Sequence, residues 1–372
     1  GPQATISFTV VAAKSTKLSV VEETSSIVDQ SKLESVFHVT KKQDSLSSLQ
    51  LFTVDLPDTK DNENVFYVKA VTDNSSEMVW SSSNPQVVSV EGSSSKTSDW
   101  AMLAAKSTGT AKITCSTDDG SKKKTTFTVK VIVPVSDLRL TNGSLITYAD
   151  PTGKEASFSA LAWGKSVQVK ATPGTAYGNP TVKKVTWSYK LGRINLDGAD
   201  GGYEFTPLSE SEEQSLIAQK IFSLKNGKVT ISSKYATACG VESKIGMRVT
   251  ATTTDGTALS ASKFIVPAEP IRKITFGNRR SSAMITVPAQ RDETGGYVCS
   301  AVMTVAYNYD MDTYYTYCKP AVKSSNPQVA TGFSAEFGVL SICAGKPGTA
   351  KLTLTATDGT NRKATLTVKV KK

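Results

Sequence analysis

The densest group of side chains able to bind another molecule lies between residues 307 and 317. Five of these positions are Tyr, whereas the whole chain has 12 Tyr in 372 residues. Tyrosine offers a large amphipathic surface with few rotatable bonds, which suits it to binding loops. The pattern predicts a binding surface made by Tyr307, Tyr309, Tyr314, Tyr315 and Tyr317. The alternative is that alternate tyrosines extend a β-hairpin and pack on one another.

The same segment has part of the spacing of a calcium-binding loop. Asn308, Asp310 and Asp312 stand at positions i, i+2 and i+4. That loop also needs a Gly for its turn and a distal Glu that binds the ion through both oxygens, and both are missing here. We therefore predict no metal site and no cofactor.

The residues needed for catalysis are scarce. The chain has one His, His38, so no mechanism that needs two imidazoles is open to it. A Cys nucleophile needs a nearby activating base, and His38 is far in sequence from the cysteines of the last third of the chain. No serine-hydrolase elbow, phosphate-binding loop or dinucleotide-binding fingerprint occurs. The sequence predicts a protein that is not an enzyme.

The five cysteines and the tryptophans are more readily explained by packing than by chemistry. Cys115 alternates with apolar residues and is predicted to be a small buried hydrophobe. Cys299, Cys318 and Cys343 are an odd number, which favours free buried thiols; a Cys299–Cys318 disulfide is the alternative, because these two flank one excursion of the chain.

Trp80 and Trp187 are predicted to pack in the core, and a sugar-binding platform is the alternative.

The elements that must position these residues repeat along the chain. Residues 109–131 and 348–370 share 13 identities in 23 positions without a gap, and residues 246–266 are a weaker copy. Related segments also precede each copy in the same order, beginning near residues 78, 185 and 321. Such internal similarity indicates repeated structural units. We predict domains at 14–133, 134–268 and 269–372, with 1–13 a tag remnant and the last strand of an earlier unit.

Each repeat carries the alternation of β-strands. Phe127, Val129 and Val131 are predicted to point inward, as are the equivalent residues of the last repeat. An Asp-Gly pair, as at Asp119, separates the two strands and supplies the positive φ of a tight turn. About seven short strands per repeat are typical of a two-sheet sandwich.

The second repeat contains an insertion, residues 191–222. Ser209 with Glu212, or Ser211 with Gln214, could form a capping box at the start of a helix. We expect Ile217, Ile221 and Phe222 to face the sheet. A helical cap on the sandwich is the favoured interpretation, and a protrusion that binds a partner is the alternative.

Composition excludes several classes of protein. The net charge is +10, but the lysines are spread over strands and turns, where they block edge pairing, so we predict no nucleic-acid binding. No apolar run is long enough to insert into a membrane. Pro-containing junctions at Pro134, Pro267 and Pro270 favour extended linkers, which predicts an elongated monomer.

The repeats resemble a known family of modules. The matching residues are the Trp-Ser-Ser-Ser-Asn-Pro segment from Trp80, Asn226-Gly227-Lys228, the Gly-Thr-Ala-Lys segment from Gly109, and the Asp-Gly turns. This pattern is similar to the group 2 bacterial immunoglobulin-like domain found in intimin- and invasin-type surface proteins. The second repeat departs from it by its insertion, and Val322 replaces the Trp in the third.

The resemblance implies an all-β fold of three tandem immunoglobulin-like β-sandwiches end to end, on a bacterial cell-surface or secreted protein. The expected function is a non-enzymatic stalk or adhesive segment that binds a host surface protein, an immunoglobulin or a glycan. The alternative is a set of carbohydrate-binding or spacer domains attached to a secreted glycoside hydrolase.

Overall fold

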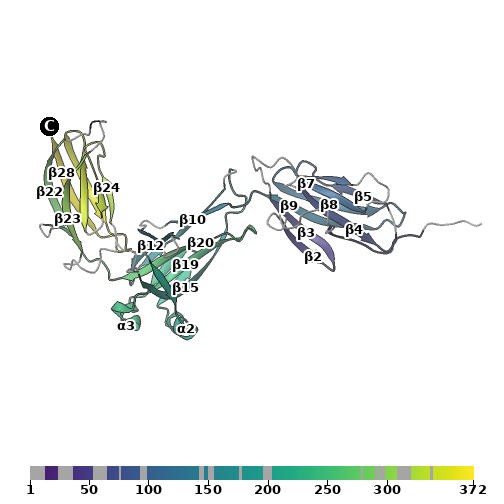
Figure 1. The fold of residues 1–372 in the computed structure, drawn as a ribbon, viewed down its shortest axis with the longest axis horizontal. Coiled ribbons are helices and arrows are strands. Elements are labelled where there is room, and N and C mark those ends of the chain that lie inside the picture. The colour runs from purple at the N-terminus through teal and green to yellow at the C-terminus, as the bar shows by residue number, and fades with distance from the viewer. Residues whose placement is uncertain are drawn as a thin grey trace, which may run out of the picture. The chain divides into compact units, whose positions relative to one another are not determined.

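In the computed structural model, β-strands far outnumber helices among the described residues (Figure 1). It describes residues 13–23, 37–52, 65–74, 77–92, 99–141, 146–149, 155–175, 178–195, 203–277, 280–289, 293, 298–307, 320–335 and 338–372. Their strands form seven sheets, and the described helices are short. The predicted fold class, tandem all-β sandwiches with a small helical insertion in the second, is confirmed.

The chain divides into two compact units. Unit 1 holds residues 1–137, 173–184 and 253–259, and unit 2 holds the remainder. The first sandwich lies in unit 1, whereas most of the second sandwich and all of the third lie in unit 2. The domain boundaries expected from the repeats, 14–133, 134–268 and 269–372, stay a prediction.

The first sandwich consists of two sheets, with strand orders β1-β4-β7-β6 and β2-β3-β9-β8-β5. Its strands are Leu18–Glu22 (β1), Phe37–Lys42 (β2), Ser45–Phe52 (β3), Val65–Thr72 (β4), Met78–Ser82 (β5), Val88–Gly92 (β6), Trp100–Ala105 (β7), Gly109–Thr117 (β8) and Lys124–Ile132 (β9). The inward residues predicted from alternation are buried: Phe127, Val129 and Val131 are each at most 1% exposed. They pack against Phe66, Val68 and other residues of the opposite sheet to form one core.

The Ser-Asn-Pro segment of the repeats has a structural role. After Asn84 the backbone turns so that the amides of Val87 and Val88 both donate to the Asn84 carbonyl. Val87 then fills the space beside Gly109, where a Cβ would lie 2.8 Å from a Val87 methyl carbon. The third sandwich repeats this packing with Val329 against Gly348. The two motifs therefore recur together because they contact each other.

The second sandwich is built on a six-stranded sheet of order β11-β12-β20-β19-β15-β16, with smaller sheets β13-β18-β17 and β10-β14. Its strands are Asp137–Thr141 (β10), Ile146–Ala149 (β11), Glu155–Ala162 (β12), Ser166–Gln168 (β13), Lys170–Gly174 (β14), Val185–Asn195 (β15), Glu204–Pro207 (β16), Phe222–Lys225 (β17), Lys228–Ile231 (β18), Ile245–Thr253 (β19) and Ser260–Ala268 (β20). The helical segments are Glu210–Ala218 (α2), Tyr235–Cys239 (α3) and the 3-10 turn Val241–Ser243 (η1).

Helix α2 begins as one of the two predicted capping boxes. Ser209 accepts from the Glu212 amide, and the Glu212 carboxylate accepts from the Ser209 amide. The expected inward face was partly wrong: Ile217 is 41% exposed, while Leu216 is buried. Ile221 and Phe222 are buried as expected, but they follow the helix, and Phe222 begins strand β17.

The third sandwich pairs sheet β21-β23-β26-β25 with sheet β22-β28-β27-β24. Its strands are Ile274–Phe276 (β21), Ser282–Pro288 (β22), Val298–Tyr307 (β23), Ala321–Ser324 (β24), Ala330–Ala335 (β25), Val339–Ala344 (β26), Gly348–Thr355 (β27) and Lys363–Lys371 (β28). Leu366, Val368 and Val370 are buried as predicted. Ala160 and Ala268 of the second sandwich join this core, so the two sandwiches of unit 2 share apolar packing.

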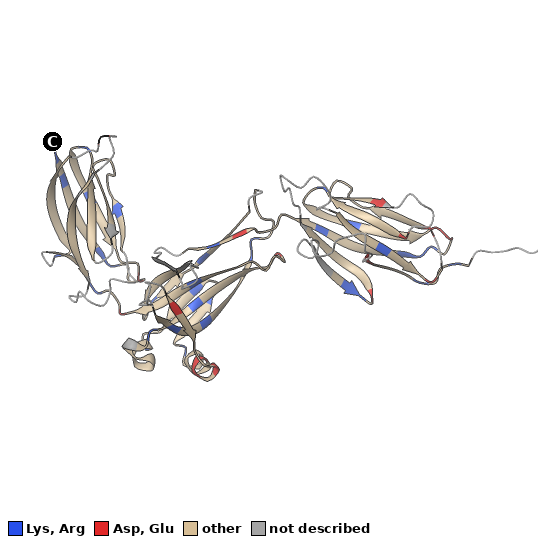
Figure 2. Ribbon diagram, in the orientation of Figure 1, with Lys and Arg blue, Asp and Glu red and all other residues tan. Residues whose placement is uncertain are grey.

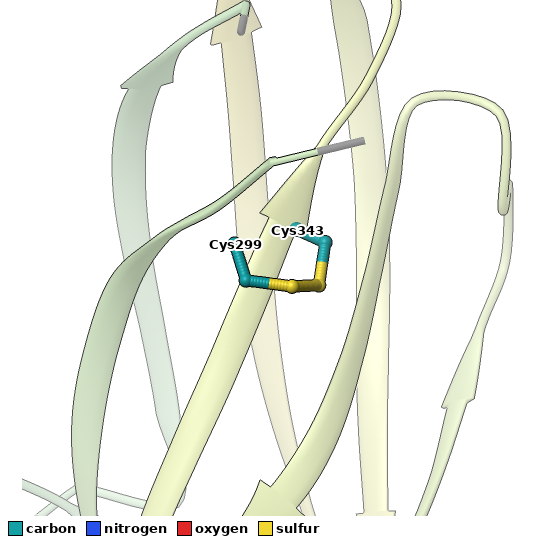
Figure 3. The surroundings of a disulfide bond; sticks show 2 residues. All are labelled: Cys299 and Cys343. Carbon is teal, nitrogen blue, oxygen red and sulfur yellow. A yellow bond between two sulfur atoms is a disulfide. The ribbon is translucent and has the colours of Figure 1, made fainter. Parts of the chain in front are cut away.

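A disulfide joins Cys299 to Cys343 across the register pair of β23 and β26 (Figure 3). The prediction of free thiols is therefore wrong for these two residues, and so is the alternative pairing of Cys299 with Cys318. Cys318 itself lies outside the described residues. Sequence spacing could not reveal the pair because the two cysteines are 44 positions apart, with strands β24 and β25 between them.

The predicted Asp-Gly turns occur in all three sandwiches, with positive φ at Gly120, Gly256 and Gly359. The Asp side chains have a second role that the sequence did not reveal. One carboxylate oxygen accepts from an amide two residues later, and the other accepts from the backbone at the start of the same sandwich. The second set of bonds runs from Ser15 to Asp119 at 2.7 Å, from Val135 to Asp255 at 2.7 Å, and from Ile271 to Asp358 at 2.9 Å.

Candidate binding surfaces

The predicted tyrosine surface begins where strand β23 ends. Tyr307 is the last residue of β23, and its backbone pairs with Ile274 of β21. Tyr309, Tyr314, Tyr315 and Tyr317 lie outside the described residues, as do Asn308, Asp310 and Asp312. Tyr307 belongs to the sheet β21-β23-β26-β25 of the third sandwich.

That sheet, β21-β23-β26-β25, has no charged residue in any of its four strands (Figure 2). Every other described sheet contains at least one Lys or Arg in its strands. The opposite sheet of the same sandwich carries Lys323, Lys351, Lys363, Lys369 and Lys371. Among the described strands of the third sandwich, positive charge is thus confined to one of the two sheets.

Exposed apolar side chains lie on this uncharged sheet. Val302 on β23 and Phe333 on β25 both pair with Ser341 on the strand between them, so the three residues form one row. Val302 is 74% exposed and Phe333 is 52% exposed. Neighbouring strands lie about 4.8 Å apart, so the two larger side chains flank the small Ser341. We call this row and its neighbours on the outer side of the sheet the uncharged face.

The disulfide lies one row away on the same sheet. Cys343 and Ser341 share the outward side of β26, whereas Leu340 and Ile342 are fully buried on the inward side. A covalent link between adjacent strands fixes their register beside Val302 and Phe333. The link therefore restrains the position of β23 relative to β26.

The tryptophans and Cys115 lie where packing explains them. Trp80 packs against the core of the first sandwich, and its indole nitrogen is buried without a hydrogen-bond partner among the described residues. Trp187 is half-buried and lies beside Gly227, whose missing side chain makes room for its ring. Cys115 is fully buried, and burial raises the pKa of its thiol to about 12. A thiol in that state is a poor nucleophile.

One buried side chain breaks the pattern of the repeats. Lys263 is fully buried in β20 opposite Val249, at the position that Phe127 and Leu366 fill in the other two sandwiches. Its ammonium nitrogen has no hydrogen-bond partner among the described residues. Burial lowers the pKa of Lys263 to about 8. The sequence does not single out this residue, because the second repeat is the weakest copy.

The insertion of the second sandwich is anchored by Glu213. The residue Glu213 is 8% exposed. Its carboxylate accepts from the buried Leu191 amide at 2.8 Å and pairs with the ammonium group of Lys190. These bonds attach α2 to the start of the insertion. The arrangement supports the helical-cap interpretation over a free protrusion.

The described residues hold no group of three or more His, Cys, Asp or Glu side chains able to bind a metal ion. No helix within them is both long and apolar enough to cross a membrane. Sequence reasoning missed Val302 and Phe333, because strand alternation marks which residues point outward but gives no reason to single out two of them.

No family model and no curated protein matches this chain. Among solved structures, a cis-dimer structure of protocadherin gammaB7 is 16% identical, covering 90% of this chain and 74% of that one, with a TM-score of 0.22. Domains 4 and 5 of the S-layer protein SbsC are 14% identical, covering 64% of this chain and 100% of that one, with a TM-score of 0.20. Likeness at this level carries no weight for function, and the fold assignment rests on the sheets themselves.

Proposed function

We propose that this chain is a non-enzymatic segment of a bacterial cell-surface or secreted protein, built from modules of the group 2 bacterial immunoglobulin-like type. Its role is to hold an adhesive surface on a series of rigid sandwiches. The third sandwich binds a protein partner, such as a host surface glycoprotein or an immunoglobulin. The observation that carries this proposal is the uncharged face with its exposed Val302 and Phe333.

The chemistry of the face favours a protein as the partner. The centres of protein interfaces are depleted of charged residues and enriched in aromatic ones. The chain has a net charge of +10, but the strands of this sheet carry no Lys or Arg. A partner can therefore cover the sheet without desolvating an ammonium group, which would be costly.

The size of the face indicates that more of the molecule takes part. Four strands of about six residues, at about 4.8 Å between strands and 3.3 Å per residue, cover roughly 400 Å². A standard interface needs about 800 Å² from each partner. The tyrosine-rich segment that follows β23 is the proposed source of the remainder.

The test compares two exposed apolar positions on the uncharged face with one on the opposite sheet. Val302→Lys and Phe333→Lys each place a charge at the proposed contact. Met284→Lys is the matched control, because Met284 is 61% exposed on the Lys-bearing sheet of the same sandwich. Binding is measured by biolayer interferometry on immobilised fibronectin, immunoglobulin G and mucin. We expect the two test variants to bind at least about thirtyfold more weakly.

Binding that survives both substitutions, or that falls equally with Met284→Lys, contradicts the proposal. No binding to any of the three proteins also counts against it.

The tyrosine-rich segment is tested on the same surfaces. Tyr309→Ala and Tyr315→Ala should weaken binding by about thirtyfold if they are central contacts, and should leave thermal stability nearly unchanged. If they lower the melting temperature by several degrees and leave binding intact, these tyrosines pack within the sandwich.

A further inference from the structure

The first sandwich carries a different surface on the equivalent sheet. On the outer side of β4 and β7, the rings of Tyr67 and Trp100 lie with centroids 6.0 Å apart and planes inclined by 58°. Trp100 is 38% exposed. Tyr67 pairs with Met102, so Trp100 is its diagonal neighbour, a separation that aromatic side chains span readily. We call Tyr67, Trp100 and Met102 the aromatic platform.

Charged side chains surround this platform. Lys69 pairs directly with Trp100 across the strands. Its ammonium group lies 3.5 Å from the Asp99 carboxylate and 3.9 Å from that of Glu23. On the other side, the exposed Glu91 pairs with Met102. Two apolar rings are thus bordered by one ammonium group and three carboxylates.

The fold does not require these residues. In the third sandwich the row equivalent to Tyr67, Met102 and Glu91 is Val302, Ser341 and Phe333. Val339 takes the place of Trp100. Both sheets form with either set, so packing alone does not explain an exposed indole beside a phenol in the first sandwich.

We propose that the aromatic platform binds the pyranose rings of a polysaccharide. A pyranose has an apolar face of C–H groups and a rim of hydroxyls. The face can lie on the indole and phenol rings, and the hydroxyls can donate to Asp99 and Glu91 and accept from Lys69. Sites for small ligands combine apolar surfaces with a few polar groups that fix orientation. This site is separate from the uncharged face and does not rest on the function proposed for it.

The charges decide between a sugar and a protein. Covering the platform with an apolar protein surface would desolvate Lys69, Asp99 and Glu91 without new partners, which is costly. The same argument disfavours a second copy of this chain pairing through this face. The hydroxyls of a sugar can instead form hydrogen bonds with these charged groups in place of the water that is lost. A sugar can therefore cover the Tyr67 and Trp100 rings without leaving the charges unpaired.

The experiment is affinity electrophoresis of the whole chain in gels that contain β-glucan, xylan, galactomannan or hydroxyethylcellulose. We expect at least one polysaccharide to retard the protein. Trp100→Ala should weaken the retardation at least about thirtyfold in apparent dissociation constant, Tyr67→Ala should also weaken it, and Tyr67→Phe should retain most of it. Val79→Ala, at an exposed apolar position on the opposite sheet of the first sandwich, is the matched control and should behave as the unmodified chain.

A second measurement guards against misfolding. Trp100 points away from the core, so Trp100→Ala should keep the melting temperature. Binding should also change the tryptophan fluorescence of the unmodified chain and not that of a Trp100→Phe variant. No retardation in any gel, or retardation that ignores Trp100→Ala, overturns the proposal. So does a dimer in sedimentation velocity that dissociates in Trp100→Ala, because it would assign this face to a second copy.

Discussion

A single lysine makes the second sandwich chemically unlike its neighbours. Lys263 is fully buried where the other two sandwiches have Phe127 and Leu366. Because burial lowers its pKa to about 8 from 10.5, the folded state binds its proton less tightly than the unfolded state does. The free energy of unfolding therefore rises with pH between about 8 and 10.5, and at neutral pH the charged form costs roughly 3 kcal/mol.

We expect Lys263→Met to stabilise the second sandwich at pH 7 by an amount of this order. The advantage should shrink above pH 10, where the lysine is neutral in both states. Urea unfolding followed by Trp163 and Trp187 fluorescence, in a chain with Trp80→Phe and Trp100→Phe, isolates this sandwich. Lys228→Met, at an exposed strand position, is the control. A destabilised Lys263→Met variant would show that the amine has a partner that holds it in place.

The limits of sequence reasoning are clear for individual residues. Phe127 and Leu366 could be predicted as core residues because alternation alone decides which way a strand residue points. The roles of Asp119, Asp255 and Asp358 could not, because the turn pattern accounts for the Asp by its local geometry. Their bonds to Ser15, Val135 and Ile271 join positions about 90 to 120 residues apart, which no local pattern records.

Among the elements, the disulfide between β23 and β26 has the most direct test. It closes a separation of 44 residues, and in the chain-entropy model such a loop stabilises the folded state by about 4 kcal/mol. We expect the double variant Cys299→Ala with Cys343→Ala to unfold at a markedly lower temperature in calorimetry. Cys318→Ala should have little effect. Peptide mapping without reduction should recover Cys299 linked to Cys343, and a peptide linking Cys299 to Cys318 would refute the pairing.

The elements were predicted to different degrees. The final hairpins of the first and third sandwiches were predictable because a tight turn and two alternating strands are all local features. The capping box of α2 was equally local. The inward face of α2 was not, because Glu213 turns toward the buried Leu191 amide, and this polar anchor brings Leu216 inward and leaves Ile217 exposed. A helix positioned by a carboxylate does not follow the apolar pattern.

At the scale of the whole molecule, one aspartate in each sandwich, in the turn of its last hairpin, accepts a hydrogen bond from a backbone amide at the start of the same sandwich. For Asp255, burial opposes ionisation, but hydrogen bonds from Thr257, Val135 and Thr253 outweigh burial and hold its pKa below the ordinary 3.8. Since the folded state favours the carboxylate, this stabilisation is fully present above pH 3.8 and is lost as the pH falls through the lowered pKa.

We expect Asp255→Ala to cost about 1–3 kcal/mol at pH 6, because it leaves the Val135 amide without its acceptor. The difference from the unmodified chain should diminish as the pH approaches 2. Calorimetry at a series of pH values measures it, with Asp118→Ala at an exposed turn position as the control. A difference that stays constant down to pH 2 would mean that the negative charge of Asp255 is irrelevant.

The aspartate hydrogen bonds also affect how easily a repeat could be added to such a chain by gene duplication. The donor at Ile271 and the acceptor at Asp358 belong to the same repeat, so the bond is encoded within a single stretch of sequence. The preceding sandwich adds the Ala162 amide, which donates to the Asp358 carbonyl, and a backbone amide is present in almost any sequence. A gene segment that encodes one repeat therefore carries most of its own junction. Duplicating it would lengthen the protein without compensating changes in the neighbouring repeats.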